Sequence, residues 1–239
     1  MKTLAYSIVA YFFGVIAISI TAIPTAAVAE LRPVNMFQSQ MMDPVFKLDN
    51  KCSAVVVKSR ASEGRKFETL LLTADHCVKG KSKGFLDDSI WEGGQLIVKR
   101  EWQYKVLRHD AVNDIALIVL HDTTTRFPAA QITSEANLYA GEMVFASGFP
   151  KGLLKTVTTG MYLYETDLSR YSRKSIADMV YVTTVPIVAG NSGGGLFQRR
   201  GDQFFLIGIT SRVMVGFEHN SLFSTLPAIK KILAFKDVL

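Results

Sequence analysis

Short apolar runs rich in β-branched and aromatic residues fill the chain from residue 45 onward, separated by clusters of Gly, Asn, Asp and Ser. A spacing of about ten residues between such runs is typical of an all-β sandwich or barrel. Helical periodicity appears only near the C-terminus, where Pro227 is suited to open a helix over about residues 227–237. We therefore predict an all-β fold with a short C-terminal helix. The runs lie at residues 54–57, 69–72, 95–98, 115–120, 143–146, 156–164, 179–185, 204–209 and 221–224.

These runs form two groups of similar size on either side of a polar connection at about residues 122–136. The chain has 239 residues with 49% hydrophobic side chains, which suits one large all-β domain or two small ones. We predict one unit over about residues 51–121 and a second over about 137–226. Residues 30–50 have weak patterning, and the sequence leaves open whether they form an extended arm or a spacer.

The N-terminus begins with Met1 and Lys2, followed by an uncharged stretch at residues 3–29 whose apolar part approaches the length of a membrane-spanning helix. Its last residues, 25–29, place small side chains at the positions that a signal peptidase reads. Two alternatives stay open: residues 1–29 are a cleaved signal peptide, or residues 3–23 anchor the chain in a membrane. Both export the remaining chain, so we expect a periplasmic or extracellular protein.

Export bears on the two cysteines, Cys52 and Cys77. An oxidising compartment favours a structural disulfide between them, whereas two free thiols are the alternative if the chain is not exported. The formal charge of +6 is scattered along the chain, without a long basic block or a recognisable nucleic-acid-binding module. We therefore expect no nucleic-acid partner.

A serine flanked by glycines, Ser192, lies in the segment Gly190-Asn191-Ser192-Gly193-Gly194 between two strand-like runs. Glycines allow backbone N–H groups to turn toward one point. The amides of Gly190 and Ser192 are therefore candidates for an oxyanion hole beside the Ser192 hydroxyl. Taken alone, the segment also fits a flexible turn.

Two further segments supply candidate partners for this serine. His76 ends an apolar run and precedes Cys77, and an imidazole can accept the hydroxyl proton at neutral pH and later return it. Asp114 stands at the entry to a strongly apolar strand, where pairing with the second imidazole nitrogen would satisfy a buried carboxylate. Asp110 is a competing carboxylate, and an ordinary hairpin turn is the other interpretation of Asp114.

Together the segments at residues 73–77, 114–117 and 190–194 resemble the motifs of the chymotrypsin/trypsin superfamily of serine peptidases, in the order His, Asp, Ser. The resemblance covers about residues 45–235. It implies two antiparallel six-stranded barrels, chymotrypsin-like, with the triad His76, Asp114 and Ser192 in the cleft between them. It also implies a serine endopeptidase that cleaves protein or peptide substrates through an acyl-enzyme intermediate.

Within the superfamily the chain looks most similar to HtrA/Deg-type and glutamyl-endopeptidase-like bacterial enzymes, on the segments 141–152 and 156–160. Unlike full HtrA proteases, this chain is expected to have no PDZ domain after the C-terminal helix. Asn191 stands where the digestive enzymes carry an Asp that pairs with a newly cut N-terminus, and a neutral amide cannot form that ion pair. We therefore expect activity without zymogen cleavage of that kind.

The resemblance also assigns a specificity pocket, with Pro186 at its base where trypsin has an Asp. Because this lining is uncharged, we expect a preference for a small or medium apolar substrate residue before the cut bond. Arg212 leaves a preference for an acidic residue open. The mechanism needs no cofactor or metal, and His109, His121 and His219 show no ligand-like cluster with Cys or carboxylates. The rival hypothesis is a catalytically latent, protease-like peptide-binding protein. The predicted pocket residues are Pro186, Ile187, Val188, Thr210, Ser211 and Arg212.

Overall fold

The computed structural model describes residues 38–88, 90–92, 95–98, 100–168, 179–214 and 220–234. The predicted signal peptide or anchor at residues 1–29, and residues 30–37 of the predicted arm, lie outside the described residues. Among the described residues, no helix combines the length and apolarity needed to cross a membrane.

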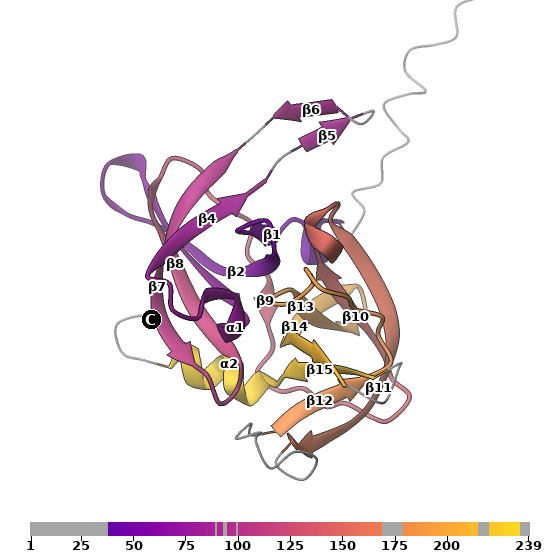
Figure 1. The fold of residues 1–239 in the computed structure, drawn as a ribbon. Helices are drawn as coiled ribbons and strands as arrows, with labels where there is room; N and C mark the ends of the chain where they lie inside the picture. Colours follow the sequence, from indigo (N-terminus) through magenta and orange to yellow (C-terminus); the bar gives the residue numbers. More distant parts are fainter. Residues whose placement is uncertain are drawn as a thin grey trace, which may run out of the picture. The chain divides into compact units, whose positions relative to one another are not determined.

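A closed antiparallel barrel forms the first half of the described chain (Figure 1). Its strand order is β1-β2-β3-β8-β7-β4. A separate two-stranded hairpin, β5 with β6, extends from the barrel between β4 and β7 (Figure 1). The barrel strands are β1 (Val45–Leu48), β2 (Cys52–Ala61), β3 (Phe67–Thr73), β4 (Lys83–Asp87), β7 (Glu101–Asp110) and β8 (Ile115–Thr123), and the hairpin is β5 (Ile90–Glu92) and β6 (Gln95–Val98).

The first barrel begins earlier than residue 51, the boundary predicted from the sequence. Strand β1 lies inside the predicted arm and pairs with both β2 and β4. A tight turn joins β1 to β2, with Asp49 at φ 48° and Asn50 at φ 57°. Two consecutive positive φ angles are typical of a type I′ hairpin turn, for which Asp and Asn are well suited. Residues 45–50 are therefore part of the barrel, and the arm interpretation was wrong for them.

The second half forms another six-stranded antiparallel barrel, β13-β10-β11-β12-β15-β14, closed by the pairing of β13 with β14. Strand β9 (Gln131–Ile132) adds to β14 in parallel, so the predicted linker carries a short strand of its own. The sequence prediction of two six-stranded antiparallel barrels is confirmed. The strands are β10 (Met143–Gly148), β11 (Thr156–Asp167), β12 (Met179–Thr183), β13 (Gly195–Arg200), β14 (Gln203–Val213) and β15 (Ser221–Ser224).

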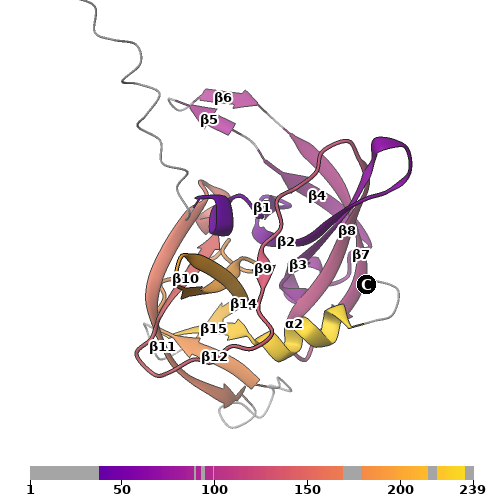
Figure 2. The ribbon, with the colours of Figure 1, turned by 180° about the vertical axis from the view of Figure 1, so that it is seen from behind.

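The described helices are short, and the longest, α2 (Leu226–Leu233), confirms the predicted C-terminal helix with Pro227 in its first turn. Figure 2 shows α2 below the strands of the first barrel and beside β15 of the second, and α2 contacts β8 and β14. The predicted helix end, residues 235–237, lies outside the described residues. The remaining helical turns are η2 (Gln38–Met42), η3 (Glu63–Arg65), α1 (Asp75–Val78) and η4 (Pro150–Gly152).

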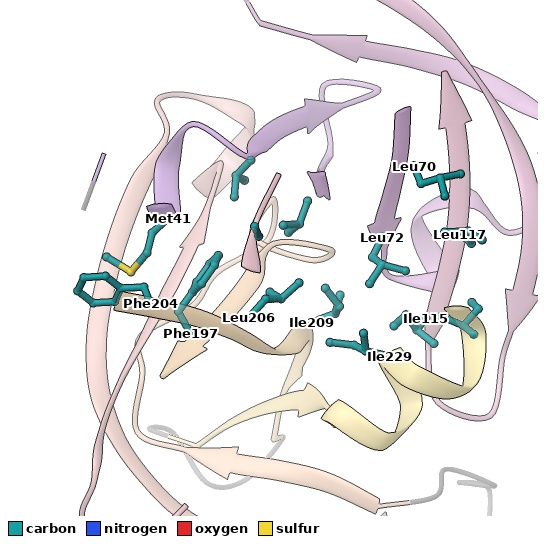
Figure 3. Packing of buried hydrophobic residues seen from close by; sticks show 14 of the residues in the cluster. Met41, Leu70, Leu72, Ile115, Leu117, Phe197, Phe204, Leu206, Ile209 and Ile229 are labelled. Carbon is teal, nitrogen blue, oxygen red and sulfur yellow. The ribbon is translucent and has the colours of Figure 1, made fainter. Parts of the chain in front are cut away.

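One buried apolar cluster connects the two barrels (Figure 3). Leu72 and Leu117 come from the first barrel, Phe197 and Leu206 from the second, and Ile229 from α2. Burying a side chain of this size stabilises the fold by about 1.5–3 kcal/mol. The shared cluster therefore holds the end of β3 and the loop before β13 in fixed positions, and these two places carry His76 and Ser192.

Candidate active site

His76 and Asp114 come together because β3 and β8 are antiparallel neighbours, with Thr73 opposite Ala116. His76 lies in α1, directly after β3, and Asp114 ends the turn that precedes β8, at φ 49°. The His76 ring Nδ1 lies 2.9 Å from Asp114 Oδ2, and the His76 backbone N–H donates to Oδ1 over 3.0 Å. The carboxylate therefore holds both the ring and the main chain of His76.

Asp114 is 5% exposed, yet its carboxylate has a full set of partners. Ser211 Oγ donates to Oδ2 over 2.5 Å, and Arg212 Nη2 lies 3.6 Å from the same oxygen. Burial alone would raise the pKa of Asp114, but hydrogen bonds from His76 and Ser211 outweigh it and hold the pKa below its ordinary value. An ionised Asp114 accepts a hydrogen bond from the Nδ1–H of His76, which leaves Nε2 free to act as a base.

Asp110, the competing carboxylate, pairs with Asn113 and not with His76. It accepts hydrogen bonds from the backbone and the side-chain amide of Asn113, over 3.0 and 2.8 Å. These contacts close the turn between β7 and β8 that presents Asp114. The structure therefore pairs His76 with Asp114, not with Asp110.

A disulfide joins Cys52, at the start of β2, to Cys77, immediately after His76. This is the bond expected from the sequence, and it ties α1 to the neighbouring strand. The two sulfurs and the His76 ring lie close together, but both sulfurs are already bonded to each other. Thiolate coordination of a metal at this place would require reduction of the disulfide.

Ser192 reaches the same open cavity as His76. The cavity has a volume of about 470 Å³. It is lined by His76 from α1 on one side, and by the segment between β12 and β13 and the end of β14 on the other. Ser192 Oγ donates to the carbonyl oxygen of Ser211 over 3.3 Å, and among the described residues it has no hydrogen bond to His76. Nucleophile contacts of this kind are often long or misaligned before substrate binds.

The turn around Ser192 depends on Gly190, whose φ is +101°. A β-carbon at this position would collide with the backbone of Phe149 and Lys151. The Lys151 N–H donates to the carbonyl of Ala189 over 2.6 Å, and in a trans peptide this directs the Gly190 N–H the opposite way. Within the described part of the chain, the N–H groups of Gly190 and Ser192 donate to no protein acceptor.

Ser53, a residue that the sequence analysis did not single out, connects this turn to the first barrel. It is fully buried. Its Oγ donates to Gly190 O over 2.8 Å and accepts the Phe149 N–H over 2.9 Å, while its own N–H donates to Ser192 O over 2.7 Å. Its place directly after Cys52 was the only sequence signal. Residues 52 and 53 thus fix both the His76 segment and the Ser192 turn.

The predicted pocket residues divide into two sets. Ile187, Val188, Ser211 and Arg212 line the cavity that holds Ser192. Pro186 is exposed and Thr210 is 1% exposed, and neither lines it. The neighbours of Pro186 in the chain, Val185 and Ile187, are both buried. The position of Pro186 at the base of a specificity pocket stays a prediction. Ala189 and Val213, not predicted, complete the lining.

His109 is an exposed residue that has a carboxylate partner not predicted from the sequence. Its Nδ1 lies 2.7 Å from Oδ1 of Asp75, a carboxylate that is 5% exposed. Asp75 directly precedes His76 in the chain, but it pairs with His109, whereas His76 pairs with Asp114. The pairing satisfies a buried charge that would otherwise be costly.

Comparison with known proteins agrees with this geometry. Residues 52–209 match the model of the trypsin-like peptidase domain. The chain belongs to the trypsin-like peptidase family. It is 30% identical to the putative serine protease HhoA of Synechocystis sp., over 60% of this chain and 34% of that protein. It is 32% identical to a probable periplasmic serine endoprotease DegP-like of Hahella chejuensis, over 60% of this chain and 27% of that protein.

A mammalian relative is serine protease HTRA3 of Mus musculus, 37% identical over 45% of this chain and 23% of that protein. The chain thus aligns with about a third or less of the length of these relatives. The crystal structure of a serine endoprotease from Yersinia pestis superposes with a TM-score of 0.61 at 20% identity, covering 85% of this chain and 66% of that one. This likeness establishes the shared fold.

Proposed function

We propose that this protein is a serine endopeptidase in which His76, Asp114 and Ser192 form the catalytic triad. The observation that carries the proposal is the single cavity shared by Ser192 and a histidine whose Nδ1 is held by a buried carboxylate. In the family of trypsin-like peptidases, to which the chain belongs, this combination is the one that activates a serine.

The proposed reaction has two stages. His76 Nε2 takes the Ser192 hydroxyl proton while Oγ attacks the peptide carbonyl, and the imidazolium then gives the proton to the leaving amine as the C–N bond breaks. Water repeats the sequence to release the acyl group and restore Ser192. Asp114 orients His76 and stabilises its imidazolium form. The N–H groups of Gly190 and Ser192, free of protein acceptors in the described structure, donate to the oxyanion.

We further propose a small or medium apolar preference for the residue that precedes the cut bond, because Ile187, Val188 and Ala189 form one wall of the cavity. Asn191 is 2% exposed and uncharged, which supports activity without an N-terminal ion pair. The Cys52–Cys77 disulfide and the periplasmic relative support export of the chain. A cleaved signal peptide and a membrane anchor remain the two alternatives for how export occurs.

One observation favours a second candidate, a latent peptide-binding protein of the same fold. The Ser192 hydroxyl donates to Ser211 O instead of to His76. Hydrolysis of an internally quenched peptide library decides between the two functions. We expect cleavage by the wild-type protein, loss in Ser192→Ala and His76→Ala, and a decrease of about 10⁴-fold in kcat for Asp114→Asn. Binding of peptides without cleavage by well-folded wild-type protein would select the latent candidate.

A further inference from the structure

Arg212 brings a guanidinium group to the cavity that holds Ser192. Its side chain is 51% exposed. Nε donates to Ser211 Oγ over 3.2 Å, and Nη2 lies 3.6 Å from Asp114 Oδ2. An arginine has five N–H donors in a planar fork. Among the described residues this one makes a single hydrogen bond, which leaves most of its donors unused.

The contact with Asp114 uses little of the hydrogen-bonding capacity of Arg212. The carboxylate already accepts close hydrogen bonds from His76 and Ser211, over 2.9 and 2.5 Å. A separation of 3.6 Å is longer than a hydrogen bond. The adjacent cavity walls, formed by Ile187, Val188 and Val213, offer no carboxylate. A half-exposed guanidinium between apolar walls is suited to receive a carboxylate from outside, because arginine binds this group with two parallel hydrogen bonds.

The edge of β14 indicates how a bound substrate would run alongside the Arg212 guanidinium. Pairing of β13 with β14 extends to Ile209, and the Thr210 N–H still donates to Gly194 O. Beyond it, Ser211 O faces the nucleophile, since Ser192 Oγ lies 3.3 Å away. Alternate residues of a strand present their backbone groups to the same edge, so Val213 faces the cavity as Ser211 does.

An extended peptide can add to this edge as one more strand. The residue before the cut bond then lies opposite Ser211, next to Ser192, and the residue two places earlier lies opposite Val213. The residue between them passes Arg212. We propose that Arg212 binds an acidic side chain, glutamate or aspartate, at the second residue before the cut bond. This inference rests on the proposed endopeptidase function and names the substrate class of the same site.

The test uses two internally quenched peptides that share a valine before the cut bond and differ only in Glu or Gln at the preceding position. A charged pair that is partly exposed should give wild-type protein about a tenfold higher kcat/KM for the Glu peptide. Arg212→Gln should remove this preference, and Arg212→Glu should reverse it in favour of a third peptide with Lys. Added salt should reduce the preference of the wild-type protein.

Arg199 provides the matched control. Its side chain is 49% exposed, it makes one hydrogen bond to Gly201 O, and it lies 3.7 Å from Asp202. Arg199→Gln should keep the full Glu preference. Equal cleavage of the Glu and Gln peptides by wild-type protein, or a Glu preference that survives Arg212→Gln, would overturn the inference while leaving the endopeptidase function intact. Absence of cleavage of every peptide would overturn the proposed function and this inference with it.

Discussion

Replacing Ser53 with alanine removes the hydroxyl that joins the Phe149 segment to the turn at Gly190. Ser53 is fully buried, so in the variant the Phe149 N–H and the Gly190 carbonyl lose their partner where water cannot replace it. Each buried polar group left without a partner costs about 1–3 kcal/mol. Because the segments can relax in part, we expect the free energy of unfolding to fall by roughly 2–4 kcal/mol.

The same change should affect catalysis beyond its effect on stability. Gly190 supplies one proposed oxyanion donor, and complete removal of such a donor lowers kcat by about 100–1,000-fold. Ser53→Ala keeps the donor but loosens its position, so we expect kcat to fall about 10- to 100-fold. KM should change little, because the oxyanion exists only in the transition state. The assays are urea unfolding and steady-state cleavage of a quenched peptide at a temperature where both proteins are folded.

Ser59 offers a matched control on the same strand, β2. Its hydroxyl also has two hydrogen-bond contacts, with Thr69 Oγ1 at 2.9 Å and with the Phe127 N–H at 3.3 Å. Ser59→Ala should lower stability and leave kcat within about twofold of wild type. The reasoning fails if Ser53→Ala loses stability but keeps wild-type kcat, or if both variants lose kcat equally.

Three further outcomes follow from single features. Gly190→Ala should lower peptide cleavage by more than about 100-fold, because a φ of +101° and the nearby backbone of Phe149 exclude a β-carbon; unaltered cleavage would contradict this. Replacing Cys52 and Cys77 with alanine should lower the free energy of unfolding by about 3.5 kcal/mol, from the closure of a loop with a separation of 25 residues, and urea unfolding measures this. Burial raises the pKa of Asp49, but hydrogen bonds from Lys81, Phe85 and Tyr104 outweigh it, and the net pKa is lowered. Its stabilising effect is present above about pH 4 and is lost as pH falls through the lowered pKa, so the stability difference between wild type and Asp49→Asn should shrink from pH 7 to pH 3; a constant difference would contradict this.

The sequence predicted nine of the fifteen described strands and missed β1, β4, β5, β7, β9 and β13. Every predicted run coincides with a strand, although β12 ends at Thr183 and not at residue 185. Strand β1 was missed because its four residues have little periodicity of their own, and their position depends on pairing with β2 and β4. Strand β9, of two residues, is likewise defined only by its partner β14.

The candidate site also contains residues that the sequence predicted and residues that it did not. His76, Asp114 and Ser192 each stand in a recognisable local motif, and the structure brings His76 to Asp114 and to the cavity of Ser192. Ser53 was not predictable, because its partners lie 96 and 137 residues away in the chain. The exposure of Pro186 was not predictable from its distance to Ser192 in the chain, since exposure depends on how the folded segment packs.

The most direct test of the central claim is labelling of the purified protein with a fluorophosphonate, followed by mass spectrometry of the modified peptide. This probe reacts with a serine that a neighbouring base has activated. We predict one adduct, on Ser192, that disappears in Ser192→Ala and is strongly reduced in His76→Ala. Well-folded wild-type protein that takes up no label, or carries it on another serine, would contradict the proposed triad.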